Sequence, residues 1–126
     1  MAGERIIVFG LTTATRVLLA PGATDMRKGF EGLFGLARDV LGEDPLSGHL
    51  FLFANRNRTR VKVLVFDGSG LWVCSKRLEK GRFAWPQAEE GQTRISMRTE
   101  ELTLLLSGLD LRQTKPRKWF RRSCAA

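Results

Sequence analysis

Residues 49–86 constrain the fold most, because they hold three short apolar runs in close succession. The runs are His49–Phe53, Val61–Phe66 and Leu71–Ser75, each rich in β-branched or aromatic residues and bounded by polar residues or glycine, which is typical of strands. Between the second and third lies Asp67-Gly68-Ser69-Gly70, a tight-turn composition in which glycine can supply positive φ. This stretch therefore predicts an antiparallel meander of three strands.

The meander also predicts where the basic residues around it lie. Successive strands run in opposite directions, so the loop after the first strand and the segment after the third leave the sheet at the same end. The cations of these two segments are Arg56, Arg58, Arg60, Lys76, Arg77, Lys80 and Arg82. We therefore expect two basic segments that are distant in sequence to converge at one end of the sheet.

Upstream of the meander, apolar residues at a period of 3.6 predict a long amphipathic helix over Thr24–Leu41. Its stripe comprises Met26, Phe30, Leu33, Phe34, Ala37, Val40 and Leu41. Thr24 or Asp25 is expected to cap the start of this helix. We expect the helix to lie on one face of the sheet.

Arg27 and Lys28 then fall in the first turn of this helix, and two interpretations of them are open. In one, they pair locally with Glu31 on a solvated surface. In the other, they join the free backbone N–H groups of the helix start to form an anion site. A helix antiparallel to the following strand would bring them beside the other basic segments.

The remaining segments complete an α+β prediction. Arg5–Phe9 and Arg16–Leu19 resemble strands that could form a hairpin, with Pro21-Gly22 closing the second. Arg94–Met97 resembles a short strand, and a Leu-rich helix follows it, capped by Thr99 and stopped by Gly108. We therefore predict a mostly antiparallel sheet of about five strands, with the long helix on one face and a short C-terminal helix.

Residues 1–112 are expected to form a single domain, and residues 113–126 a basic flexible arm. No apolar run approaches the length of about 18 residues that a membrane helix needs, and the N-terminus lacks a secretory pattern, so a cytoplasmic location is expected. Two well-separated cysteines indicate free thiols. The two cysteines and the one histidine match no metal-ligand spacing, so we expect neither a metal nor a cofactor.

The chain holds 21 Lys and Arg against 13 Asp and Glu, a net charge of +8, which favours a polyanionic partner over mere solubility. An enzyme is not expected. A metal-dependent nuclease needs clustered carboxylates, and the candidates Asp25, Asp67 and Glu79 should not meet, because the Asp67 turn and Glu79 lie at opposite ends of the meander. Trp85 is interpreted as a core residue, with stacking on a nucleic-acid base as the alternative.

Several blocks of the chain, in order, resemble one known family. The blocks are Thr24-Asp25-Met26-Arg27-Lys28-Gly29-Phe30, Asp44-Pro45-Leu46-Ser47-Gly48-His49-Leu50-Phe51, Lys62-Val63-Leu64, Asp67-Gly68, Gly70-Leu71, Lys76-Arg77-Leu78-Glu79 and Gly81-Arg82-Phe83-Ala84-Trp85-Pro86. They resemble TnpB, the accessory protein of insertion sequences of the sixty-six type, over roughly residues 15–112. This TnpB is unrelated to the RNA-guided nucleases that share its name.

The resemblance implies a bacterial, non-catalytic protein that serves transposition beside a separate transposase. The charge pattern adds a binding surface for the DNA of the element ends, for the transposase, or for both. The residues expected in it are Arg27, Lys28, Arg56, Arg58, Arg60, Lys76, Arg77, Lys80 and Arg82. The alternatives are a pure protein adaptor that docks an acidic surface of the transposase and, less favoured, the nuclease. Oligomeric state and DNA sequence preference are not readable from the sequence.

Overall fold

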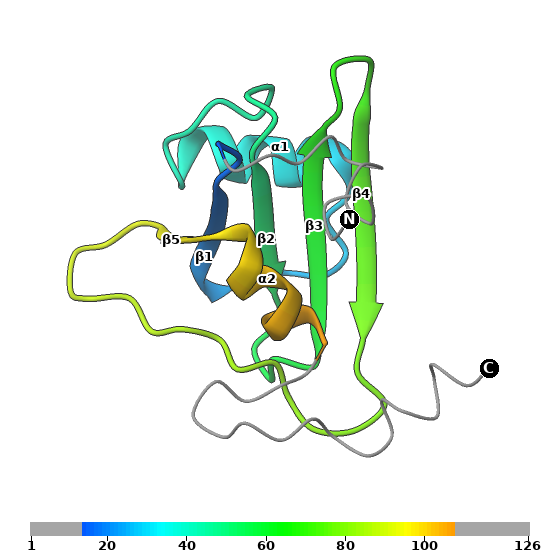
Figure 1. Ribbon diagram of the computed structural model, residues 1–126, viewed down its shortest axis with the longest axis vertical. Coiled ribbons are helices and arrows are strands. Elements are labelled where there is room, and N and C mark those ends of the chain that lie inside the picture. The colour runs from blue at the N-terminus through cyan, green and yellow to red at the C-terminus, as the bar shows by residue number, and fades with distance from the viewer. Residues whose placement is uncertain (1–13, 108–126) are drawn as a thin grey trace.

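A five-stranded mixed sheet with two helices makes up the computed structural model, which describes residues 14–107 (Figure 1). The strands are β1 (Val17–Ala23), β2 (Leu50–Ala54), β3 (Arg60–Phe66), β4 (Leu71–Arg77) and β5 (Ile95–Met97), and the helices are α1 (Phe30–Asp39) and α2 (Thr99–Leu106). The order in the sheet is β4-β3-β2-β1-β5. The expected α+β class, strand number and mostly antiparallel pairing are thus confirmed, and the parallel β1–β2 pair makes the sheet mixed.

The meander of β2, β3 and β4 is confirmed, with antiparallel pairing of both neighbours. Asp67 fixes the turn between β3 and β4, because its Oδ1 accepts hydrogen bonds from the backbone N–H groups of Ser69 and Gly70 and its Oδ2 accepts one from the Trp72 indole. These donors, the indole first, hold the pKa of the Asp67 carboxyl well below its usual range. The hairpin therefore contains its own charge-stabilised turn.

The prediction for the strand before α1 was wrong in two respects. β1 does not end before Pro21-Gly22 but continues to Ala23, with a register shift between Leu19 and Ala23 that marks a bulge or irregularity. It pairs in parallel with β2 and antiparallel with β5. The other half of the expected hairpin, Arg5–Phe9, lies outside the described residues. β1, α1 and β2 thus form a β-α-β unit rather than part of a second hairpin.

The prediction of a long helix was also wrong, because α1 has only 10 residues and starts at Phe30. Gly29 is its N-cap, and no side chain forms a capping hydrogen bond there. Neither Thr24 nor Asp25 therefore caps the helix. The Asp25 side chain instead accepts a hydrogen bond from the backbone N–H of Arg27 at 2.9 Å. This forms an Asx-type turn, which competes with helix formation. α1 lies across the strands rather than antiparallel to β2 (Figure 1).

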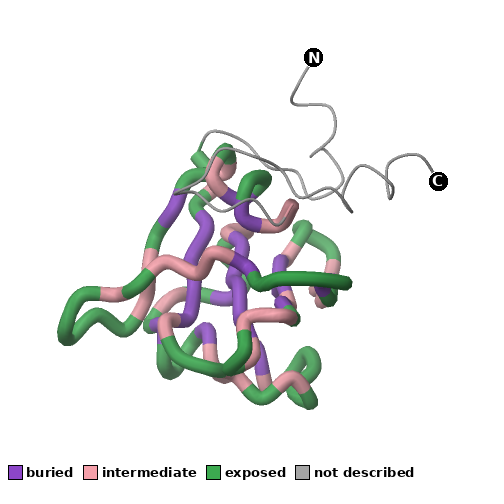
Figure 2. The backbone as a smooth tube through the Cα atoms, turned by 90° about the horizontal axis from the view of Figure 1, so that it is seen from below, coloured by how far each residue is buried: buried purple, intermediate pink, exposed green. Residues whose placement is uncertain are grey.

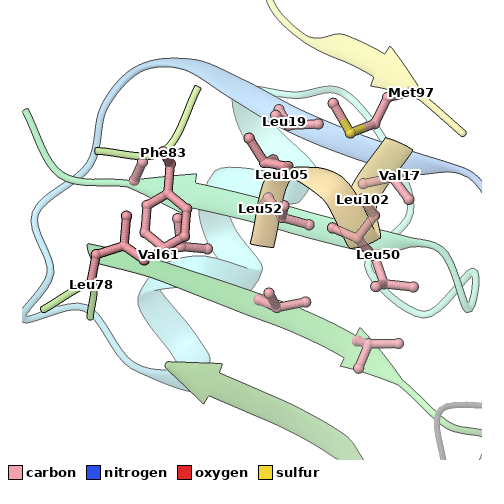
Figure 3. Packing of buried hydrophobic residues seen from close by; sticks show 13 residues of the cluster. Val17, Leu19, Leu50, Leu52, Val61, Leu78, Phe83, Met97, Leu102 and Leu105 are labelled. Atoms are coloured by element: carbon pink, nitrogen blue, oxygen red, sulfur yellow. The ribbon is translucent and has the colours of Figure 1, made fainter. Parts of the chain in front are cut away.

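Each face of the sheet carries a separate apolar core, and buried strands lie between exposed loops (Figure 2). On the α1 face, Leu33, Ala37 and Leu41 pack against Phe51 and Phe53 of β2, with further contacts from β1 and β3. On the opposite face, α2 contributes Leu102 and Leu105, and Phe83, from the segment after β4, packs on the same core near Val61 (Figure 3). The segment that follows β4 is therefore anchored rather than free.

The expected C-terminal strand and helix are confirmed as β5 and α2, although Arg98, not Thr99, is the N-cap of α2. The expected stop at Gly108 and the basic arm lie outside the described residues. Among the described residues, neither helix is long and apolar enough to cross a membrane. Cys74 is a free, half-buried thiol of β4.

Candidate nucleic-acid interface

Basic segments from three parts of the chain meet at one end of the sheet. β1, β2 and β4 finish there and β3 begins there, as the parallel and antiparallel pairings require (the lower end in Figure 1). We call this the basic end. The loop between β2 and β3 and the segment after β4 lie together at it, joined by backbone hydrogen bonds from Leu78 to Thr59 and from Phe83 to Arg58, of 2.9 and 2.7 Å.

Arg60 and Arg77 are directly opposed across β3 and β4 at this end. The bond from Leu78 N–H to the Thr59 carbonyl flanks them, so theirs is a non-hydrogen-bonded pair, in which opposed Cα atoms are only about 4.5 Å apart. Both side chains are exposed, and no carboxylate of the described residues forms an ion pair with either. Like charges placed opposite each other destabilise a sheet, so folding alone does not explain this pair.

Lys62 and Lys28 extend this cluster on the α1 face. Alternation along β3 puts Arg60 and Lys62 on the same face as the buried Leu64, which belongs to the α1 core. Lys62 donates a hydrogen bond from Nζ to the Lys28 carbonyl at 2.8 Å, so the segment before α1 lies against β3. Lys62 was absent from the expected set, although its place two residues after Arg60 in an alternating strand was a usable signal.

Arg58 lies at the basic end but is a structural residue. It has a left-handed backbone with φ 59°, rare for a residue other than glycine. Its Nη2 donates to the Pro21 carbonyl at 2.8 Å, and its guanidinium lies 5.1 Å from the ring centroid of Trp85. Burial lowers its pKa, and Nη1 is buried without a hydrogen-bond partner. Arg58 therefore joins the segment after β4 to β1, through the Pro21 carbonyl and the Trp85 ring.

Lys76 is likewise engaged within the fold. Lys76 and Cys74 lie two residues apart on β4, so both face α2. Nζ of Lys76 donates a hydrogen bond to the carbonyl of Leu106, at the end of α2, at 2.6 Å. A cation at a helix C-terminus is favoured by the helix dipole. Partial burial lowers the pKa of Lys76. The ammonium group thus fastens α2 to the sheet.

Arg27 was expected in the first turn of the helix but precedes it, as does Lys28. Its guanidinium donates to both oxygens of Asp25, at 2.8 to 3.1 Å, and this hydrogen bonding lowers the pKa of Asp25 to about 2. Local pairing is therefore present, with Asp25 rather than the expected Glu31. The charge of Arg27 is largely balanced at short range.

The other expected cations, Arg56, Lys80 and Arg82, are exposed residues of the two segments at the basic end. Five of the nine expected side chains are exposed and, among the described residues, have no ion-pair partner. We call them the open cations: Lys28, Arg56, Arg60, Arg77 and Lys80. Their exposure and missing counter-charges fit contact with an anionic partner.

The described carboxylates do not assemble a metal site. No group of three or more His, Cys, Asp or Glu residues within residues 14–107 is placed to hold a metal ion. Asp67 lies in the β3–β4 turn, at the end of the sheet opposite the segment that carries Glu79, and its oxygens are taken by the turn. The clustered carboxylates of the nuclease alternative are not found among the residues that the structure describes.

Comparison with known proteins gives independent evidence of the family to which the chain belongs. The family model described as "IS66 Orf2 like protein" matches residues 15–116 of the chain. Uncharacterized protein y4hO of Sinorhizobium fredii is 46% identical over 97 residues, which cover 77% of this chain and 83% of that protein. Uncharacterized protein y4jC of the same organism is 33% identical over 108 residues, covering 86% and 91%. No solved structure matches the chain.

Proposed function

Because the chain belongs to the IS66 Orf2-like family of transposition accessory proteins, we propose that it serves transposition by binding DNA of the element ends through its basic end. The observation that carries the proposal is the opposed Arg60–Arg77 pair without a carboxylate partner. A pair that costs folding energy is retained when another task uses it. DNA phosphates would relieve its repulsion.

The open cations suit contact with the backbone of DNA rather than with base edges. They come from a strand pair and three connecting segments, and no helix of the described chain presents them to a groove. Such contacts position a protein on DNA without reading its sequence. The expected set of nine contacts therefore shrinks to about five. Arg58 and Lys76 bind backbone carbonyls, Arg27 forms an exposed ion pair with Asp25, and Arg82 makes a further interaction.

Salt dependence tests the proposal quantitatively. About five phosphate contacts give a slope of about −4.5 in log affinity against log salt, so affinity should fall roughly 500-fold between 50 and 200 mM salt. Fluorescence anisotropy of a labelled element-end duplex with the full chain measures this. An affinity that stays flat across this range contradicts DNA binding through the basic end.

The same cations would also suit an acidic surface of the transposase, which is the adaptor alternative. Pull-down of the transposase by the chain, with and without nuclease treatment, separates the two. Capture that disappears on nuclease treatment supports DNA as the direct partner. Capture that survives treatment, together with flat DNA binding, supports the adaptor.

A further inference from the structure

We infer that the basic end takes double-stranded rather than single-stranded DNA, because its aromatic side chains within residues 14–107 are committed to the fold and leave only phosphate contacts there. This inference rests on the proposed function and specifies its substrate class. Proteins that bind single strands combine a basic groove with aromatic side chains on which bases stack. A basic surface without such a platform favours the duplex, whose charge density is greater.

Trp85 is the residue at the basic end best suited to stack on a base, and the structure engages it in three ways. Its indole N–H donates to the Ala20 carbonyl of β1 at 3.0 Å. The Arg58 guanidinium lies over its ring, 5.1 Å from the centroid. The ring also packs against the apolar core of the α2 face. A base that stacked on Trp85 would have to displace one of these partners.

Phe83 is the other aromatic residue of this segment, and it is also engaged in the core. Its side chain is 2% exposed and packs beside Val61 and Leu78 (Figure 3). The exposed large aromatic residues of the described chain are Phe30, on α1, and Trp72, near the β3–β4 turn. Neither comes from the β2–β3 loop or from the segment after β4.

The electrostatic difference between the two substrates has a definite size. Each phosphate contact adds about 0.9 to the slope of log affinity against log salt on a duplex, and about 0.7 on a single strand, through counterion release. For about five contacts, this difference makes duplex binding about tenfold tighter at 0.1 M salt. One stacked base would add about fivefold or more to single-strand binding and erode that preference.

The test compares a duplex with each of its separated strands, by anisotropy at 0.1 M salt with the full chain. A second readout uses the variant Trp72→Phe/Trp119→Phe, in which Trp85 is the one emitter, since the chain has three tryptophans. A stacked base quenches indole emission. We expect about tenfold tighter duplex binding, with a salt slope steeper by about one, and unchanged Trp85 emission on either substrate.

Single-strand affinity equal to or above that of the duplex, or quenching of Trp85 by the single strand, overturns the inference while leaving DNA binding itself intact. If neither substrate binds, the proposed function fails and the inference fails with it. The intact chain gives the affinity ratio even if the Trp72 substitution disturbs the turn that its indole supports. The two failures are therefore distinguishable in one set of titrations.

Discussion

Replacing both Arg60 and Arg77 by glutamine should stabilise the protein and weaken its binding to DNA. The two side chains are opposed on β3 and β4, and no carboxylate of the described residues forms an ion pair with either. Glutamine keeps much of the aliphatic stem and removes the charge. Relief of a directly opposed like-charge pair should raise the free energy of unfolding by between about 0.2 and 1 kcal/mol.

The effect on DNA binding follows from the two phosphate groups that the double variant can no longer neutralise. With two of about five phosphate contacts removed, the salt slope should fall from about −4.5 to about −2.7. Affinity at 0.1 M salt should then drop by about 60-fold. Urea unfolding gives the stability change, and anisotropy titrations of the duplex at several salt concentrations give the slope.

A matched control separates the effect of the position of the two arginines from the effect of the lower net charge. The double variant Arg38→Gln/Arg98→Gln removes the same two charges, from sites on α1 and before α2, where each arginine pairs with a neighbouring carboxylate. It should not raise stability and should leave the salt slope unchanged. If both doubles weaken binding equally, or if the Arg60/Arg77 double leaves the slope intact, the basic end is not the DNA contact.

Three further substitutions test the assignments within the fold. Arg58→Ala removes the hydrogen bond to Pro21 and the contact with Trp85, so urea unfolding should show a loss of about 1–3 kcal/mol, whereas Arg56→Ala should change stability by less than about 0.5 kcal/mol. Lys76→Met should leave the DNA salt slope unchanged, because the Lys76 ammonium binds the end of α2; a shallower slope would show that it contacts phosphate. The carboxyl of Asp67 has a lowered pKa in the fold, so its ionised form stabilises the folded chain. This contribution to the free energy of unfolding is present above the ordinary pKa of 3.8 and is lost as the pH falls through the lowered pKa. Asp67→Asn should therefore lose less stability than the parent chain between pH 5 and pH 2, and equal acid sensitivity in thermal unfolding would contradict this assignment.

The strands of the meander could be predicted because their signals are local. Alternating apolar residues, β-branched composition and the Asp67–Gly70 turn all act within a few residues. The position of β1 could not be predicted, because its pairing with β2 depends on a crossover rather than on a turn. Pro21-Gly22 indicated a strand end, yet β1 continues to Ala23 past a register shift, where a residue without an N–H group is tolerated.

The error in helix length has an equally physical origin. Apolar periodicity counted Met26 into the helical stripe, and Met26 does pack against the core of the α1 face. It does so from a turn, however, because the Asp25 side chain accepts the Arg27 N–H group and Gly29 leaves the helical conformation. Periodicity reports which side chains reach a core and not which backbone carries them there.

For the site, sequence could place the cations but not judge their burial. The convergence of the β2–β3 loop with the segment after β4 followed from strand direction alone. That Arg58 and Lys76 bind backbone carbonyls depends on where Pro21 and Leu106 lie, which are 37 and 30 residues away in the chain. Contacts at such separations leave no local pattern, so the sequence could not show that backbone carbonyls bind these two cations.

The parallel pairing of β1 with β2 strengthens the case for the basic end. In an antiparallel meander alone, one inter-strand loop and one outgoing segment would meet there. The β-α-β unit makes β1 finish at the same end as β2 and β4, so the segment that carries Lys28 also leaves the sheet there. Sheets of parallel β-α-β units bind ligands beyond the carboxyl ends of their strands, and here three strands present those ends with open cations and unmatched charge. The crossover that sequence missed is therefore what brings a third basic segment to the site.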